Sequence, residues 1–375
     1  MASTTELLSR SVAGLNALAT VLLLIGFVKI KAGDKIGHGK AMGAAYLPGY
    51  VEVADTAGRE AFNKRWKTTL PTKPGLDAAA MFAPPTKLKA LWLDRHNPAV
   101  SASYCDANEA LKNMELVVLQ NIFMTKTAEY AHVVLPVVAY GEEEVTFTST
   151  ERRIQHAVKA IEPPAGLPSA WQQIVEVANR MGATWSYPDS AAVLKEIAAT
   201  VPEYEAVTMD TLTRGYGRQW PCTHNHPLGT PILFTEPEKK LRFAALHTSP
   251  PEDIADQSYP FVLSFGHSLY YWHQNTLIRH SETLKREYGI LLLDYPEGFV
   301  EINSEDAKAL SIRDGQRVKL VSPEGEALTF ARVTSEVRHG IIYIPFYLQD
   351  VIRALGKECS GQSGKSSHVR LEKAL

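Results

Sequence analysis

Cysteine is scarce in this chain of 375 residues, and the three that occur, Cys105, Cys222 and Cys359, stand far apart. No pair has the CxxC spacing, so the chain has no ligand set for an iron–sulfur cluster of its own. Scattered cysteines also make no disulfide framework, which fits a reducing compartment. We therefore expect a cytoplasmic location and no iron–sulfur cluster on this chain.

An excess of charge of either sign is also lacking, because 39 Lys and Arg face 41 Asp and Glu. A net charge of −2 gives no global field to attract nucleic acid. The content of 45% hydrophobic and 21% charged residues is ordinary for a globular protein. The length exceeds that of one compact domain, so two or three domains are expected.

A long uninterrupted hydrophobic run is missing as well. Residues 12–30 are apolar but are broken by Asn16, Thr20 and Gly26, and their most apolar part, residues 17–28, is short for a membrane span. No small-residue cleavage site follows it. We expect a buried helix and strand here. The alternative is a membrane or signal segment, which would place the protein at the membrane as part of a complex.

Strand-like and helix-like segments alternate through the middle of the chain. Apolar runs lie within residues 87–98, 115–123 and 132–141, with helical stretches at 107–114 and 125–131 between them. This alternation is typical of an α/β protein with a doubly wound parallel sheet. Ligands bind such sheets beyond the carboxyl ends of the strands, which here are the loops 94–101 and 120–127.

The chain turns to β-structure from Tyr259 onward. Short strands are predicted at FVLSF, GFVEI, RVKLVS, ALTFARV and GIIYIPF, with a capped helix starting at Asn303. Turns are expected at RDG (313–315) and PEG (323–325). A small closed barrel with one inserted helix suits this pattern. Earlier, a helix is predicted over 169–182, capped by Ser169 and ended by Gly182, and Arg152 or Arg153 is expected to pin a loop.

Three segments resemble molybdopterin oxidoreductases, and among them the formate dehydrogenase alpha subunit most closely. The first is LQNIFMTKTAEYAHVVLP (119–136) followed by TFTSTERRIQ (146–155). The second is GHSLYYWHQNTLIRHS (266–281), and the third is GFVEINSEDAKALSIRDGQRVKLVSPEG (298–325). Shorter similarities are MGAAYLPGY (42–50), Asn97-Pro98 and QWPC (219–222), so the resemblance covers nearly the whole chain.

The resemblance implies a molybdopterin guanine dinucleotide cofactor, with molybdenum or tungsten, between an α/β domain and a double-psi-like β-barrel. On this reading residues 1–85 are a remnant of cofactor-binding domains with a Gly-rich loop. Residues 86–255 form the Rossmann-like domain with a connector, and residues 256–375 form the dinucleotide-binding barrel. Residues of this chain would bind the cofactor but carry no catalytic or metal-ligating group.

The resemblance assigns cofactor contacts residue by residue. In the α/β domain these are Asn97, Ser101, Gln120 and Asn121. In and after the barrel strands they are Gly266, His267, Trp272, His273, Thr276, Phe346 and Lys365. An amide such as that of Gln120 can both donate to and accept from a nucleotide edge, and Lys365 could pair with a phosphate.

The parts of a formate dehydrogenase that hold the metal are absent from this sequence. The metal-ligating Cys or selenocysteine with its following His and the iron–sulfur domain are missing, and Lys31 stands where an Arg is expected. Asn121, His132 and Val145 also replace the usual Asp, Asp and Gly. Either a partner chain supplies the metal ligand and cluster, as in a split oxidoreductase with further electron-transfer subunits, or the chain is a scaffold without molybdenum in a respiratory NADH dehydrogenase-type complex.

Overall fold

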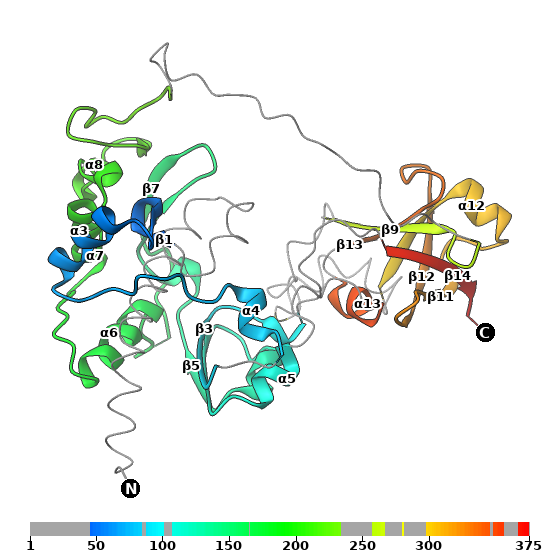
Figure 1. Ribbon diagram of the computed structural model, residues 1–375. Helices are drawn as coiled ribbons and strands as arrows, with labels where there is room; N and C mark the ends of the chain where they lie inside the picture. Colours follow the sequence, from blue (N-terminus) through cyan, green and yellow to red (C-terminus); the bar gives the residue numbers. More distant parts are fainter. Residues whose placement is uncertain are drawn as a thin grey trace, which may run out of the picture. The chain divides into compact units, whose positions relative to one another are not determined.

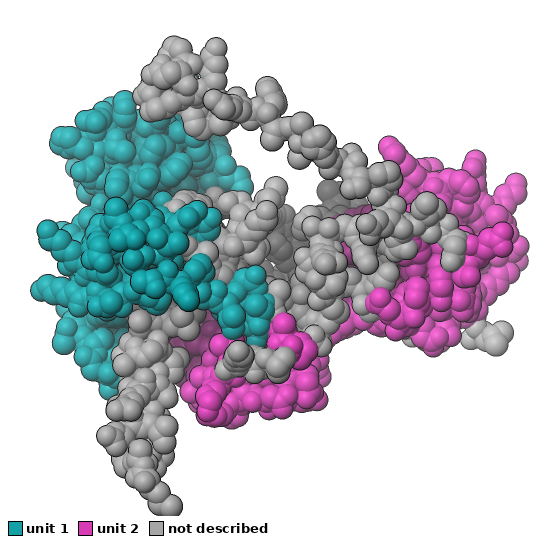
Figure 2. Space-filling model, in the orientation of Figure 1, with its two compact units in different colours: residues 1–81, 136–243 teal, residues 82–135, 244–375 magenta. Residues whose placement is uncertain are grey.

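A computed structural model describes residues 46–84, 88–100, 107–164, 166–233, 257–266, 280, 298–345, 348–355 and 367–374. The apolar segment 12–30 and Lys31 lie outside these residues. The chain forms two compact units, each made of two separate stretches: residues 1–81 with 136–243, and residues 82–135 with 244–375 (Figure 2). The three-domain division inferred from the sequence stays a prediction beside these units.

The first unit combines short helices with a three-stranded antiparallel sheet. The three-stranded sheet contains β6 (Val145–Thr148), β7 (Arg153–Ala157) and β8 (Arg218–Gln219), and a separate two-stranded sheet contains β1 (Tyr46–Leu47) and β2 (Val51–Glu52). Its helices are η1 (Pro48–Tyr50), α3 (Thr56–Trp66), η4 (Tyr140–Glu142), α6 (Ala170–Arg180), α7 (Ser190–Thr200), η5 (Pro202–Tyr204) and α8 (Met209–Thr213). The sheet has the order β6-β7-β8, which the sequence reading missed.

Helix α6 begins and ends where the sequence predicted. Ser169 is the N-cap in a capping box with Gln172, whose side chain accepts from the Ser169 N–H at 2.9 Å. Gly182 follows the helix with a φ of +100°, a conformation that glycine adopts at little cost.

The second unit contains the parallel sheet and the barrel. The sheet has the order β3 (Ala90–Asp94), β4 (Leu116–Asn121), β5 (Val133–Pro136), and β3 and β4 run parallel. The short helices η2 (Pro98–Val100), α5 (Ala107–Lys112) and η3 (Lys126–Tyr130) connect these strands, and α4 (Ala78–Phe82) precedes them. The predicted mixed α/β class with a parallel sheet is confirmed.

The barrel closes from six strands in the order β10-β12-β11-β14-β9-β13. The strands are β9 (Phe261–Gly266), β10 (Phe299–Asn303), β11 (Arg317–Val321), β12 (Glu326–Thr334), β13 (Ile341–Pro345) and β14 (Ser367–Lys373), with helices α12 (Ser304–Ala309) and α13 (Gln349–Ala354) packed on them (Figure 1). Five strands and α12 match the prediction, and β14 was missed. Asn303 caps α12, its Oδ1 accepting from the Glu305 N–H at 2.8 Å.

Alternating side chains fill the barrel with an aliphatic core. Its fully buried members are Val300, Ile302, Val318, Leu320, Ala331, Ile342, Ile344, Leu355 and Val369. At about 25 cal/mol per Å² of apolar surface, each large aliphatic side chain contributes roughly 1.5–3 kcal/mol. The barrel therefore is stabilised by its own core.

One hydroxyl interrupts this core without a hydrogen-bond partner. Thr329 of β12 is fully buried, and its Oγ1 has no partner. We expect Thr329→Val to stabilise the protein by about 1 kcal/mol, because the swap removes an unsatisfied buried hydroxyl at nearly constant volume. Denaturant unfolding of the purified protein measures this. Thr334→Val is the matched control and should destabilise, since the Thr334 hydroxyl accepts from the Glu336 N–H at 3.2 Å. A destabilised Thr329→Val variant would contradict the expectation.

Candidate ligand-binding site

The loops that follow β3 and β4 leave the sheet side by side. The two strands are parallel and in register, with Asp94 beside Gln120. The chain turns sharply at Arg95, whose φ is +50° and whose N–H donates to the Gln120 carbonyl at 2.8 Å. The carboxyl ends of neighbouring parallel strands are where an α/β sheet offers a ligand site.

A threonine joins the two loops. The fully buried Thr127 donates through Oγ1 to Asn97 Oδ1 at 2.7 Å, and its N–H donates to the same oxygen at 3.1 Å. Thr127 Oγ1 in turn accepts from the Ala99 N–H at 3.2 Å. The resemblance assigned Asn97 to the cofactor. In the structure its side-chain oxygen, Oδ1, holds the loop after β3 against the loop after β4.

Gln120 is fully buried in this structure rather than displayed on the surface. Its Oε1 accepts from the Trp92 Nε1–H at 2.7 Å, across the β3–β4 pair. This hydrogen bond orients the amide at the end of the strand. The assignment of Gln120 as a cofactor contact stays a prediction.

The two residues that replace aspartate in the sheet region keep an acceptor in place. Asn121 is buried, and its Oδ1 accepts from the Ile122 N–H at 2.8 Å and the Phe123 N–H at 3.3 Å. His132 Nδ1 accepts from the Val117 N–H at 3.0 Å. A carboxylate could make the same bonds, so these substitutions preserve the local fold. Val145, the third departure, is paired with Ala157 in the β6–β7 ladder and needs no glycine conformation.

Thr125, in the loop after β4, has a side-chain hydroxyl with an unmet hydrogen-bonding capacity. Its side chain is 3% exposed, and Oγ1 has no partner. Thr125 immediately precedes η3 but makes no side-chain cap. An unsatisfied buried hydroxyl costs about 1–3 kcal/mol. A polar ligand group at this loop would supply the missing partner.

In the barrel, the strands β9 and β13 run parallel and end together. Gly266 lies beside Pro345 at these carboxyl ends. A Cβ on Gly266 would lie 2.8 Å from the Tyr343 hydroxyl, so only glycine lets this tyrosine approach the strand end. Tyr343 was not singled out from the sequence. Its place near the strand end follows from its register opposite Ser264, which the sequence does not show.

The other residues assigned by resemblance lie outside the described part of the chain. They are Ser101, His267, Trp272, His273, Thr276, Phe346 and Lys365. Gly266 and Pro345 directly precede His267 and Phe346, so the structure places the starting points of two of these segments next to each other.

A half-buried carboxylate flanks Tyr343 on the outer surface of the barrel. Glu301 pairs with Tyr343 across strands, and Arg332 Nη1 donates to Glu301 Oε1 at 3.2 Å. Burial raises the pKa of Glu301, Arg332 opposes this rise, and Glu336 adds to it. Burial likewise raises the pKa of Tyr343, so its hydroxyl keeps its proton at neutral pH.

The raised pKa of Glu301 makes a prediction about stability and pH. The folded state holds this proton more tightly than the unfolded chain, so the stabilisation is complete below about pH 4.5 and is lost as pH rises through the raised pKa. We expect Glu301→Gln to be more stable than the parent at pH 7, with the gain vanishing toward pH 4. Unfolding midpoints across this range measure it, with Glu326→Gln, at an exposed ion pair, as control. A gain that is the same at both pH values would contradict the assignment.

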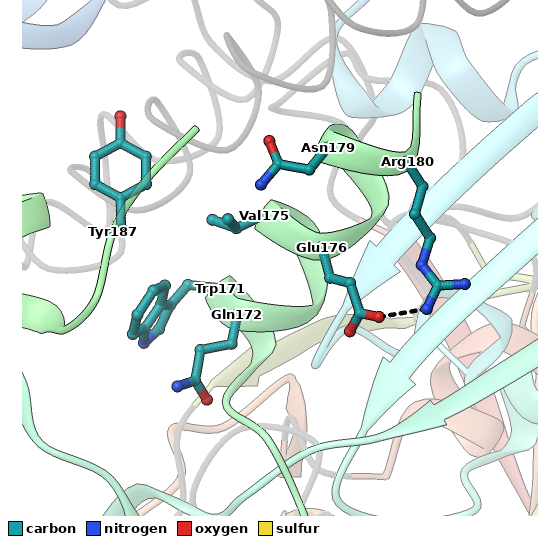
Figure 3. A pocket seen from close by; sticks show the side chains of 7 residues that line it. All are labelled: Trp171, Gln172, Val175, Glu176, Asn179, Arg180 and Tyr187. Atoms are coloured by element: carbon teal, nitrogen blue, oxygen red, sulfur yellow. Dashed lines mark hydrogen bonds and ion pairs between the residues drawn. The ribbon is translucent and has the colours of Figure 1, made fainter. Parts of the chain in front are cut away.

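The first unit has a hollow of about 530 Å³ beside helix α6 (Figure 3). Trp171 and Val175 line it from α6 and Tyr187 from the segment that follows. Glu176 and Arg180 pair with each other at 2.6 Å instead of converging on a ligand. None of the residues assigned by resemblance lines this hollow, and its polar groups are not arranged as a binding set.

Side-chain contacts define the roles of Arg152 and Cys222 in the first unit. Arg152 donates to the carbonyls of Trp220, Thr230 and Pro231, the latter two at 3.1 and 3.0 Å, so it pins the loop after β8 as predicted. Cys222 is fully buried, and its Sγ donates to the Gln219 carbonyl at 3.3 Å. Burial raises the pKa of this thiol, which makes it a packing residue.

The fold defines a class of protein: a parallel α/β sheet and a closed six-stranded barrel, each with loops at the carboxyl ends of its parallel strands. Residues 5–180 match the family described as Molybdopterin oxidoreductase, and residues 261–365 match the Molydopterin dinucleotide binding domain. The chain belongs to the molybdopterin oxidoreductase family. No helix in the described residues is long and apolar enough to cross a membrane.

Curated relatives include formate dehydrogenase alpha subunits. The chain is 33% identical over 309 residues to the F420-dependent formate dehydrogenase subunit alpha of Methanocaldococcus jannaschii, covering 80% of this chain and 44% of the relative. It is 32% identical over 309 residues to formate dehydrogenase H of Escherichia coli, covering 80% of this chain and 42% of the relative. The chain therefore spans less than half the length of these relatives.

A solved structure shares the fold. Acetylene hydratase from Pelobacter acetylenicus superposes with a TM-score of 0.60 at 16% identity, over 85% of this chain and 50% of that chain. At this identity the likeness concerns the fold alone.

Proposed function

We propose that this chain is the cofactor-cradling part of a formate dehydrogenase-like molybdopterin oxidoreductase that works with a partner chain. The partner would carry the metal-ligating Cys or selenocysteine and the iron–sulfur cluster, and further subunits would accept the electrons. The observation that carries the proposal is the buried, unpartnered hydroxyl of Thr125 in the loop after β4. This loop lies in the segment that most resembles the family's cofactor-binding sequence.

The residues of this chain would bind and orient the cofactor. Thr125 would donate to or accept from a polar group of the nucleotide tail, and the Asn97–Thr127 pair would keep both loops in register for it. In the barrel, the neighbouring ends of β9 and β13 would present the segments that begin at His267 and Phe346. Molybdenum or tungsten bound by the pterin would supply the two-electron oxidation, and protein groups of this chain would exclude water and fix the position.

A scaffold without molybdenum, of the NADH dehydrogenase type, is the alternative. The sequence supports this alternative through Asn121, His132 and Val145, which replace the residues usual in the family. Asn121 and His132 nevertheless keep a hydrogen-bond acceptor for backbone N–H groups at their positions. These substitutions are therefore conservative in structure, which favours the cofactor-binding proposal.

A metal and pterin assay on the purified native complex separates the two functions. We expect molybdenum or tungsten and pterin at about one cofactor per chain. Their absence from a complex that contains iron would support the scaffold. Expressed alone, the chain should be inactive and poorly soluble, since half of a cofactor cleft exposes apolar surface.

The barrel's contribution is tested by His273→Ala. We expect this variant to lower the pterin content of the complex more than it lowers the thermal unfolding temperature, because the resemblance places His273 at the cofactor and not in the core. Fluorescence of the oxidised pterin released from the complex measures retention. A matched control is His339→Ala, whose exposed imidazole pairs with Asp306 at 2.6 Å and to which the resemblance assigns no cofactor contact. Normal pterin content in the His273 variant would count against the placement.

A further inference from the structure

Helix α13 of the barrel has two different faces. Val351 and Ile352 are buried in the barrel core, which fixes the helix to the barrel. Asp350 and Arg353 are three residues apart and therefore lie on one side of the helix. Arg353 contacts the loop after β3, and Asp350 interacts electrostatically with Lys126 in the loop after β4. These loops belong to the same compact unit as α13.

Arg353 reaches the loop after β3. Its Nη1 donates to the Ala99 carbonyl across 254 positions of sequence. With the Asn108 amide turned so that both its atoms are satisfied, Asn108 donates to the same carbonyl at 3.1 Å and accepts from Arg353 Nη2 at 3.2 Å. Arg353 thus uses two arms of its planar guanidinium, a geometry that Lys cannot reproduce.

The contact continues into the candidate site. Ala99 is almost fully buried, and its N–H donates to Thr127 Oγ1, the hydroxyl that holds Asn97. A chain of hydrogen bonds therefore runs from helix α13 through the backbone of Ala99 to the loops after β3 and β4.

The loop after β4 has its own contacts with the barrel half of the unit. The pKa of Lys126 is raised chiefly by its hydrogen bond to Glu129, with a smaller contribution from Asp350 of α13. Phe123 stacks on His280, with ring centroids 4.7 Å apart and an interplanar angle of 12°. The Phe123–His280 contact thus joins the loop after β4 to the later part of the chain, and α13 reaches this loop through Ala99 and Thr127.

We propose that α13 sets the position of the loops after β3 and β4, with Arg353 as the positioning residue for residues 97–100. The effect on cofactor retention rests on the proposed function, whereas the effect on the loop does not. Arg353 contacts the Ala99 carbonyl and Asn108, so the proposed effect is on the position of the loop.

The test uses the native complex with Arg353→Gln, Arg353→Lys and Asn108→Ala. Hydrogen exchange at the amides of Ala99 and Thr127 reports on the loop, and released pterin reports on retention. We expect Arg353→Gln to speed exchange at Ala99 about tenfold and to lower pterin content severalfold, with Arg353→Lys restoring only part of both. Arg370→Gln is the control, because Arg370 pairs with Glu372 on the barrel surface at 2.6 Å and should change neither.

Three results separate the explanations. Unchanged exchange at Ala99 in Arg353→Gln would overturn the role of α13. Faster exchange with full pterin content would overturn its link to the cofactor. A parent complex without pterin would refute the proposed function, while the exchange comparison would still decide whether Arg353 positions the loop. Should Arg353→Gln not assemble, Asn108→Ala gives the same comparison, and the double variant should be no worse than Arg353→Gln alone if both residues act through one contact.

Discussion

Thr127→Val should destabilise the protein by about 2–3 kcal/mol, because it removes a buried hydroxyl that makes two hydrogen bonds. Thr127 is fully buried, and Oγ1 both donates to Asn97 Oδ1 and accepts from the Ala99 N–H. Valine matches threonine in size, so no cavity forms. The loss comes from the Ala99 N–H, which is left without its acceptor, and from Asn97 Oδ1, which keeps only its bond from the residue-127 N–H. Denaturant unfolding of the purified complex measures it, and pterin content should fall with it.

Thr127→Ser is the matched control for this prediction. Serine keeps the hydroxyl and removes one methyl group, so its cost should be only about 1 kcal/mol. The expected order is parent, then serine, then valine. If valine proved at least as stable as serine, packing rather than hydrogen bonding would hold the loops together, and Asn97 would be released for a ligand.

Gly325→Ala should be more damaging, with an expected loss of about 3 kcal/mol or more, because overpacking against rigid backbone is not relieved by a side-chain movement. A Cβ on Gly325 would lie 2.0 Å from the Ala354 carbonyl oxygen at the end of α13. The same turn is held to α13 by Ser322, whose Oγ donates to the Leu355 carbonyl at 2.9 Å. The substitution must push α13 away from the turn between β11 and β12.

Gly141→Ala provides the control for the glycine effect itself. Nothing lies within 4 Å of a Cβ at Gly141. Alanine there should be neutral or should stabilise by about 0.4–1 kcal/mol through the unfolded chain. Thermal unfolding of the two variants side by side tests the comparison. Equal effects would show that loss of glycine flexibility, and not the contact with α13, governs stability at Gly325. If α13 shifts in Gly325→Ala, exchange at Ala99 should also rise.

The sequence predicted the elements whose signals are local. Alternating apolar residues gave the strands β9 to β13, and Asn303, Ser169 and Gly182 marked helix ends through caps that need only neighbouring residues. Arg152 was predicted to pin a loop, and it does. The strands β14 and β8 were missed, because their pairing depends on partners distant in sequence. The hairpin of β6 and β7 was missed as well, although these two strands are neighbours in sequence.

The sequence predicted the segments of the candidate site and their contacts with a cofactor, but not the contacts among the side chains of this chain. The motif at 119–136 located the loop after β4, but the sequence could not show that Asn97 is bound by Thr127, or that Gln120 is buried against Trp92. Thr125 lies inside this motif but was not singled out, and Tyr343 and Arg353 lie outside it. Their importance comes from burial, from a strand register and from a contact across 254 positions.

Local chemistry in the sequence thus determined the family, the two fold types and the loops for which we propose a nucleotide-tailed ligand. Only the tertiary structure decided which side chains in those loops are occupied by their neighbours and which keep an unmet hydrogen bond. The physical reason is that satisfaction of a buried polar group depends on partners brought together by folding, and periodicity along the chain carries no information about them.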